Sequence, residues 1–145
     1  MKVSTKGRYA LRLMIDLAEH DSGDYIPLRD ISERQGISVK YLEQIVTQLS
    51  RAGFLRSVRG AQGGYRLSRH PENYSVGEIL RITEGDLAPI SCLTDDTTRC
   101  PRQAECPTFD FWKGLHRVIN DYVDSVSLDD LIQRHRLKMG GDYSI

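Results

Sequence analysis

The sequence lacks any long hydrophobic run. None of its apolar segments approaches the roughly 20 residues that a membrane-spanning helix needs. The first residues, Met1 to Arg8, also lack the apolar core of a secretory signal peptide. We therefore expect the protein to be cytoplasmic.

Signatures of enzyme active sites are missing as well. The chain contains no nucleophile elbow, no phosphate-binding P-loop and no pair of histidines at metal-binding spacing. These absences favour a binding protein over an enzyme.

Cysteine is scarce and unevenly placed. The 145 residues include three cysteines, and all three lie in the stretch from Cys92 to Cys106. An odd number cannot pair completely within one chain, and a cytoplasmic location disfavours structural disulfides. Their gathering in one polar segment therefore needs a different chemical explanation.

The chain as a whole has no excess of positive or negative charge, since its net charge is zero. Residues 1–70, however, hold 12 Lys and Arg against 7 Asp and Glu, a net charge of +5. Residues 71–145 hold 8 against 13, a net charge of −5. Apart from chance, such a split favours an N-terminal half that meets a polyanion.

Periodicity and breaker residues predict three helices and then a hairpin in the first half of the chain. The apolar spacing predicts helices over 5–21, 27–36 and 38–52. Two strand-like runs, 54–58 and 65–68, flank a connection that contains three glycines. The expected fold class is mainly α with a small β-hairpin wing, a winged helix-turn-helix.

The second half is predicted to continue with a helix over 75–85 and an irregular segment that holds the cysteines. A long helix over 109–125 and a short one over 128–136 follow, and the chain then ends in a loose tail. The long helix carries apolar residues three and four apart, which is typical of helices that pair. We expect this dimerisation stripe to consist of Trp112, Leu115, Ile119, Tyr122 and Val126.

These elements predict four parts of the chain. They are a winged DNA-binding domain over 1–85, a cysteine-bearing sensor loop over 86–107, dimerisation and C-terminal helices over 108–137, and a tail over 138–145.

The third predicted helix has a polar face opposite its apolar stripe. Glutamine can pair with adenine, glutamate can accept a hydrogen bond from cytosine, and serine or lysine can bind phosphates. The same face could be an ordinary solvated surface, but the neighbouring hairpin favours DNA. It carries Arg56, Arg59 and Arg66 around glycines whose backbone can approach a ligand closely.

Three motifs resemble those of a family of bacterial transcription regulators. They are Ser4-Thr5-Lys6-Gly7-Arg8-Tyr9, Ile37-Ser38-Val39-Lys40-Tyr41-Leu42-Glu43-Gln44 and Val58-Arg59-Gly60-Ala61-Gln62-Gly63-Gly64-Tyr65. Over about residues 2–133 the chain resembles the Rrf2 family, which includes an iron–sulfur cluster regulator and a cysteine-metabolism repressor. The resemblance implies a homodimer with one winged domain per DNA half-site. It also implies that Glu43 and Gln44 contact bases and that Arg59 enters the minor groove.

The helix face, the hairpin, the N-terminal polar residues and the motifs together define a set of candidate DNA-binding residues. The set consists of Ser4, Thr5, Lys6, Arg8, Ser38, Lys40, Tyr41, Glu43, Gln44, Thr47, Arg51, Arg59, Gly60, Gln62, Gly63 and Tyr65.

The cysteines are candidate metal ligands. Cys92, Cys100 and Cys106 are separated by seven and then five residues, which differs from the Cys-x2-Cys spacing of zinc knuckles. Soft thiolates on a loop suit an iron–sulfur cluster, and we expect the 2Fe-2S type. The family's cluster-binding members carry three cysteines in this segment. Their histidine three residues after the last cysteine is Phe109 here, which leaves Glu105, Asp110, a partner-subunit group or an exogenous ligand as the fourth donor.

Other roles for the cysteines stay open at this point. The thiols could sense oxidants, with Arg99 and Arg102 stabilising a thiolate, or they could bind zinc, or they could be inert.

Three functions are compatible with these features. The first is a regulator whose DNA binding depends on the cluster. The second is a cluster-free repressor of cysteine or sulfur metabolism under a partner enzyme, and the third is an iron–sulfur carrier without DNA binding. A cysteine-synthesis enzyme or an iron–sulfur assembly protein is a corresponding partner.

Overall fold

The computed structural model describes residues 2–94 and 100–141. This part of the chain is mostly helical with one antiparallel hairpin, so the expected fold class is confirmed. None of its helices is both long enough and apolar enough to span a membrane. In chain order the elements are α1 (Thr5–Glu19), α2 (Leu28–Gln35), α3 (Val39–Arg51), β1 (Leu55–Val58), β2 (Gly64–Leu67), η1 (Pro71–Asn73), α4 (Val76–Glu84), η2 (Ser91–Leu93), α5 (Phe109–Ser125) and α6 (Leu128–Gly141).

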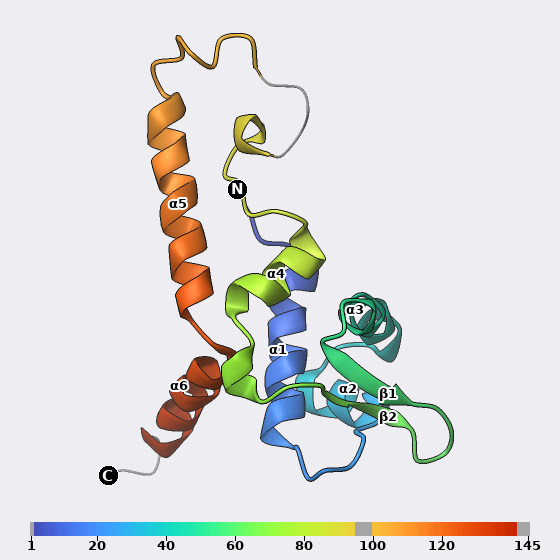
Figure 1. The fold of residues 1–145 in the computed structure, drawn as a ribbon. Helices are drawn as coiled ribbons and strands as arrows, with labels where there is room; N and C mark the ends of the chain where they lie inside the picture. Colours follow the sequence, from blue (N-terminus) through green and yellow to red (C-terminus); the bar gives the residue numbers. More distant parts are fainter. Residues whose placement is uncertain (1, 95–99, 142–145) are drawn as a thin grey trace.

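Helix α1 is the centre of the molecule (Figure 1). It begins at Ser4, whose hydroxyl oxygen accepts a hydrogen bond from the Gly7 amide at 3.2 Å. Leu13 and Met14 are fully buried, and the helix packs against α2, α3, α4, α6 and β2. The main core therefore forms around α1, and the other elements are positioned relative to it.

A buried ion pair joins α1 to α2. The Asp16 side chain is fully buried and accepts from Arg34 through both carboxylate oxygens, at 2.7 and 3.0 Å. Gln35 donates to the same carboxylate at 2.9 Å. The hydrogen bond with Asp16 raises the pKa of the Arg34 guanidinium above its ordinary value. The polar groups that this contact buries are thus paired, and the first helix of the helix-turn-helix is fixed against α1.

The turn into α3 has the expected signals. Gly36 ends α2 in the left-handed conformation, with φ of 66°, and Ser38 caps α3 by accepting from the Tyr41 amide at 3.2 Å. Leu42, Ile45, Val46 and Leu49 form the buried stripe of α3, as predicted.

Backbone conformation and close packing within the chain explain the three glycines of the hairpin. Gly60 adopts a φ of +112°, and a side chain on Gly63 would meet the Val58 carbonyl oxygen at 2.3 Å. A side chain on Gly64 would likewise meet the Ile26 backbone at 2.3 Å, and Ile26 is bridged to Tyr65 by two backbone hydrogen bonds of 2.8 and 2.9 Å. Each of the three glycines therefore serves the turn or its packing, and close approach of their backbone to a ligand stays a prediction.

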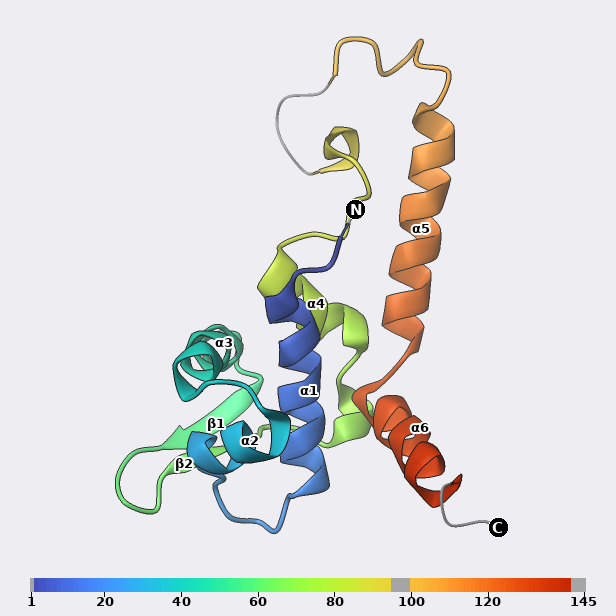
Figure 2. The ribbon, with the colours of Figure 1, turned by 180° about the vertical axis from the view of Figure 1, so that it is seen from behind.

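Helix α5 lies alongside α4 and extends past the N-terminal end of α1 (Figure 2). Ile119, Val123 and Val126 pack against a second apolar cluster built around Val76, Leu80 and Leu87. At the same contact, Arg81 donates to both carboxylate oxygens of Asp124 at 2.7 and 2.9 Å. Apolar packing and an ion pair thus hold α5 against α4.

Part of the expected dimerisation stripe packs within its own chain. Val126 is 5% exposed inside the second cluster, and Ile119 is half-buried against it. The exposed apolar residues of α5 are Phe111, Val118 and Tyr122, which are between 59% and 65% exposed. Helix α5 therefore has two neighbouring apolar stripes, and regular spacing cannot tell which one its own chain covers.

Helix α6 is longer than predicted and belongs to the winged domain. It continues to Gly141, beyond the expected end near residue 136, so only residues 142–145 of the expected tail lie outside the described residues. Leu128 and Ile132 enter the main core, and His135 lies 2.9 Å from Glu19 of α1. The chain thus leaves the winged domain for α5 and returns to it in α6.

We expect the change of Arg34 to Met to lower the free energy of unfolding by about 2–3 kcal/mol, because the buried Asp16 carboxylate loses its bidentate partner. Urea unfolding at one fixed protein concentration measures this loss. Arg29→Met, a change at an exposed position of the same helix, is the matched control. Equal stability of the two variants would contradict the prediction.

Candidate nucleic-acid interface and cysteine segment

The polar face of α3 is exposed. Lys40, Glu43, Gln44, Thr47 and Arg51 are all solvent-exposed, opposite the buried stripe. The Thr47 hydroxyl donates to the backbone carbonyl oxygen of Glu43 at 2.7 Å. The Glu43 carboxylate takes no part in this bond. The structure thus presents acceptors, donors and cations together on one surface of a helix.

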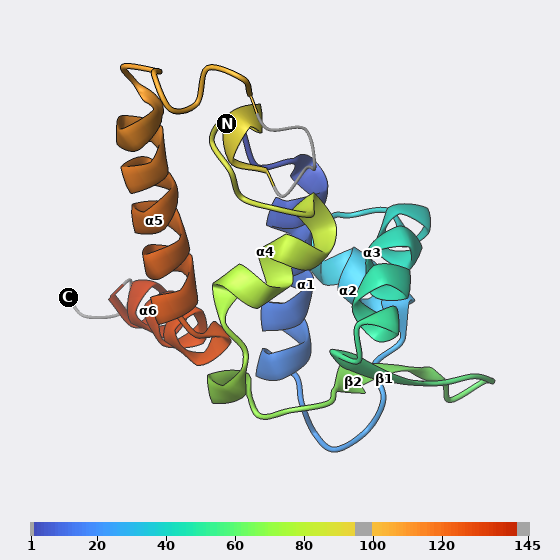
Figure 3. The same ribbon diagram turned by 45° about the horizontal axis from the view of Figure 1, so that its top comes forward.

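The wing lies on the same side of the molecule as α3. Figure 1 and Figure 3 show both at the side of α1 away from α5, with the hairpin projecting beyond the helices. Arg59, Gly60 and Gln62 are exposed on the connection between β1 and β2. A helix face and an arginine-bearing hairpin on one side form a surface suited to the adjacent grooves of a duplex.

Four of the predicted DNA-binding residues have roles within the fold. The half-buried Tyr41 ring lies edge-on to Tyr9, with 5.6 Å between ring centroids, and Tyr65 packs against the main core. Gly63 has no room for a side chain, and Ser4 caps α1. These four residues therefore also shape the surface on which the exposed side chains of α3 and the wing lie.

The N-terminus of α1 adds a polar edge. Thr5 and Arg8 are exposed and paired, since the Arg8 guanidinium donates to the Thr5 hydroxyl at 3.1 Å, and Lys6 is half-buried. An open hollow of about 640 Å³ is lined by Lys2 to Thr5 and by Arg8.

Sequence reasoning missed Glu84, at the end of α4. Its carboxylate accepts from both the backbone amide and the hydroxyl of Ser4, at 3.0 and 2.6 Å. No pattern in the sequence indicates a contact across 80 positions. The contact joins the start of α1 to the end of α4, where the cysteine segment begins.

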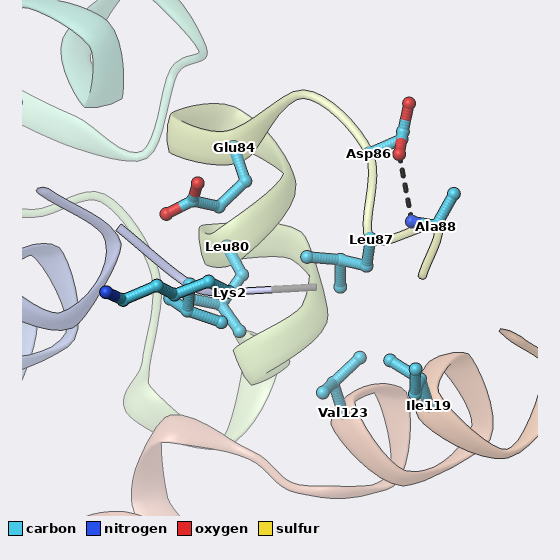
Figure 4. Close-up of a pocket in the computed structure, with 9 residues that line it drawn as sticks. Lys2, Leu80, Glu84, Asp86, Leu87, Ala88, Ile119 and Val123 are labelled. Carbon is cyan, nitrogen blue, oxygen red and sulfur yellow. Dashed lines mark hydrogen bonds between the residues drawn. The ribbon is translucent and has the colours of Figure 1, made fainter. Parts of the chain in front are cut away.

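An apolar pocket of about 150 Å³ lies beside this contact, between the N-terminal residues, α4 and α5 (Figure 4). Leu87 is buried against α4, and the Asp86 carboxylate accepts from the Ala88 amide at 2.9 Å. The beginning of the cysteine segment is therefore anchored to the winged domain. Leu80, Glu84, Leu87, Ile119 and Val123 are among the lining residues.

The three cysteines are free thiols on the segment between α4 and α5. Cys92 is exposed in η2, Cys100 is exposed, and Cys106 is half-buried just before α5. A hydrogen bond with the Thr108 hydroxyl, helped by the Thr108 and Phe109 amides, lowers the pKa of the Cys106 thiol. A lowered pKa favours the thiolate form in which cysteine binds a metal.

Two of the cysteines share a surface hollow of about 510 Å³. Cys100, Cys106 and Asp110 line it, together with Gln103 and Phe109. In residues 2–94 and 100–141, no group of three His, Cys, Asp or Glu side chains is close enough to hold a metal ion. The hollow gathers two expected ligands and Asp110, but it does not include Cys92 or Glu105. Arg99, expected near the thiols, lies outside the described residues.

These features are those of a winged helix-turn-helix transcription regulator that binds DNA. The family follows from a model described as "Iron-dependent Transcriptional regulator", which matches residues 3–134, so the chain belongs to the Rrf2 family.

Similar proteins support this assignment. The chain is 37% identical over 142 residues to the HTH-type transcriptional regulator IscR of Aliivibrio salmonicida, a match that covers 98% of this chain and 83% of that protein. A solved structure of CymR, described as the global cysteine regulator of B. subtilis, has a TM-score of 0.76 and 35% identity, over 92% of this chain and 98% of that one. The structure of T. potens IscR has a TM-score of 0.71 and 38% identity, over 93% and 88%.

Proposed function

We propose that this chain is a cytoplasmic, homodimeric regulator whose affinity for its operator is changed by an iron–sulfur cluster on the three-cysteine segment. The observation that carries the DNA-binding part is the placement of the exposed polar face of α3 and the Arg59 hairpin on one side of the molecule. The cluster part is supported by the thiols around the hollow before α5.

In this proposal, α3 enters the major groove. Glu43 and Gln44 contact base edges, while Lys40, Arg51 and the N-terminal residues of α1 bind phosphates. Arg59 reaches the minor groove, whose negative potential attracts a guanidinium. The residues that shape the surface, such as Tyr41 and Tyr65, hold these side chains in position.

We expect Arg59→Ala to weaken binding to a promoter fragment about tenfold at fixed salt, because the guanidinium is removed from the minor groove. Fluorescence anisotropy measures the affinity, and far-UV circular dichroism confirms the fold. Arg136→Ala, at an exposed position of α6, removes the same charge elsewhere and should bind like the wild type. An Arg59 variant of unchanged affinity would argue against the minor-groove contact.

Dimerisation is proposed to use the exposed stripe of α5. Phe111, Val118 and Tyr122 lie on one face with the half-buried Leu115, beside the stripe that contacts α4. A two-fold axis would pair this face with itself and bury it, since a symmetric dimer places the same patch on both sides of the contact. Each protomer then presents one winged domain to one half-site.

We expect Val118→Asp to convert the dimer to a monomer, because it places a charge in the middle of this apolar face. Light scattering after size-exclusion chromatography measures the mass. Lys113→Gln, which also lowers the charge by one on another face of α5, should remain dimeric. A dimeric Val118 variant would show that another surface joins the protomers.

The chemistry of the donors fits an iron–sulfur cluster. Cys100 and Cys106 would be two ligands at the hollow, and Cys92 would join them from η2. Asp110 is favoured over Glu105 as the fourth donor, because it lines the hollow and Glu105 does not. A bound cluster would supply one-electron redox chemistry and a labile, oxygen-sensitive link between the ends of the segment.

In this proposal, contacts at both ends of the cysteine segment relate the cluster to the DNA-binding domains. Leu87 anchors the start of the segment beside the Glu84–Ser4 contact, and the segment ends at α5. Pulling Cys92 toward the hollow therefore acts on the start of α1 and on the angle of the dimer helix together. Either change alters the spacing of the two winged domains.

We expect the anaerobically purified protein to contain iron and sulfide and to show visible absorbance. Cys100→Ser should abolish both, Asp110→Ala should make the cluster more labile, and Glu105→Ala should leave it unchanged. The difference in DNA affinity between cluster-bound and cluster-free protein should vanish in Cys100→Ser. Iron-free wild-type protein that still binds DNA would exclude the cluster and leave the DNA-binding function intact.

A cluster-free regulator of cysteine or sulfur metabolism is the second candidate. The similarity to the CymR structure favours it, and so does the separation of Cys92 from the hollow in the described residues. In that case a cysteine-synthesis enzyme would be the partner that controls DNA binding.

A further inference from the structure

Two arginines lie directly opposite each other on the wing. Arg56 of β1 pairs with Arg66 of β2 in the strand register, next to the Leu55–Leu67 pair that points toward the core. Because successive side chains of a strand alternate in direction, the arginines occupy the outer face of the hairpin. Like charges at directly opposite positions destabilise a hairpin, so a bound anion would stabilise this pair.

The two arginines line a cleft of about 180 Å³ at the base of the wing. Arg69 and His70 complete its basic lining, and Asp21 is the acidic residue among those that line it. The remaining lining residues are Leu67 and Ser68. Arg66 and Arg69 each have a carboxylate nearby, Asp21 and Glu78, so the three guanidinium groups leave a net positive charge of one for a phosphate group.

Two of the arginines are held in place by the fold. Arg69 lies over the Phe54 and Tyr74 rings, at 4.6 and 5.1 Å from their centroids, and donates to the Asn73 carbonyl oxygen at 3.2 Å. It also lies 3.5 Å from Glu78. These contacts fix the guanidinium before any ligand arrives.

Arg66 is similarly restrained. It donates to the Gly23 carbonyl oxygen at 2.8 Å, lies over the Tyr25 ring and is 4.0 Å from Asp21. Arg56 is exposed at the mouth of the cleft. The cleft thus combines restrained cations with one exposed cation that can reach outward.

The position of Arg56 relates the cleft to DNA. Arg56 of β1 precedes Arg59, which follows the end of the strand, by three residues, an extended span of roughly 10 Å. If Arg59 lies in a minor groove, the base of the wing comes close to the phosphates that border the groove. This step rests on the proposed function.

We propose that the cleft formed by Arg56, Arg66 and Arg69 binds backbone phosphates of the DNA that flanks the half-site read by α3. The contact is independent of sequence, and it gives each protomer a second attachment outside the bases it reads. It lengthens the duplex needed for full affinity and increases the salt dependence of binding.

The test uses a duplex enriched from a random-sequence pool by the wild-type protein. One version ends just outside the half-sites, and a longer version continues for several base pairs on each side. The wild type should bind the longer version more tightly. Arg56→Gln should bind the longer duplex about threefold to tenfold more weakly and the shorter one almost normally. Its salt slope should fall by about 1 for each phosphate that the variant no longer neutralises.

Arg56→Lys keeps the charge and should restore most of the affinity for the longer duplex. Arg136→Gln on α6 removes one charge elsewhere and should leave the length dependence unchanged. Thermal unfolding checks that the Arg56 variants are folded.

Several results would overturn the proposal. One is an Arg56→Gln protein that keeps the length dependence, and another is an equal loss of affinity for both duplexes. Inorganic phosphate that binds in an Arg56-dependent way, with no effect of Arg56 on the longer duplex, would make the cleft a small-anion site instead. If the wild type enriches no duplex at all, the DNA-binding function itself fails, which is distinct from these results.

Discussion

The arrangement of the DNA-binding surface depends on one buried carboxylate. Asp16 sits in the middle of α1 with its charge removed from solvent, and it is held by Arg34 and Gln35 from the end of α2. Because a buried charge without partners is unfavourable, α2 has one favoured position against α1. Helix α3 follows α2 after a single tight turn at Gly36. The position of α2 therefore also determines where the polar face of α3 lies. The wing is tied to the same frame through the bridge between Ile26 and Tyr65.

A second junction relates this frame to the rest of the chain. Glu84 binds Ser4 at the start of α1, Leu87 anchors the following segment, and Ile119 and Val123 of α5 line the pocket beside them. The N-terminus, the cysteine segment and the long helix therefore meet at one place. A regulator needs its sensing segment to act on the geometry of its DNA-binding domains, and this junction is where such coupling has a physical route.

Much of the local structure was predictable, because it depends on neighbours in the chain. Capping by Ser38, termination at Gly36 and the apolar stripe of α3 are local signals, and α5 was predicted with the same bounds as in the structure. The exposed residues of α3 and the wing tip were likewise predicted from the polar face and the hairpin. The Ser4–Glu84 contact, the packing of Tyr65 and the approach of Ile26 to Gly64 were not, because each depends on a partner far away in the sequence.

The class of protein follows from the sequence alone: a helical winged domain, an arginine-bearing hairpin and a cysteine-bearing segment before a long helix. Amphipathic periodicity and turn residues act over a few positions, so they can be read from the chain. Three features became visible only in the folded chain: which apolar stripe of α5 stays exposed, the packing of α6 on the core, and the presence of Asp110 rather than Glu105 at the hollow with Cys100 and Cys106. Those outcomes depend on which surfaces pack across long sequence separations, and apolar spacing is the same for a stripe that meets its own chain as for one that remains free.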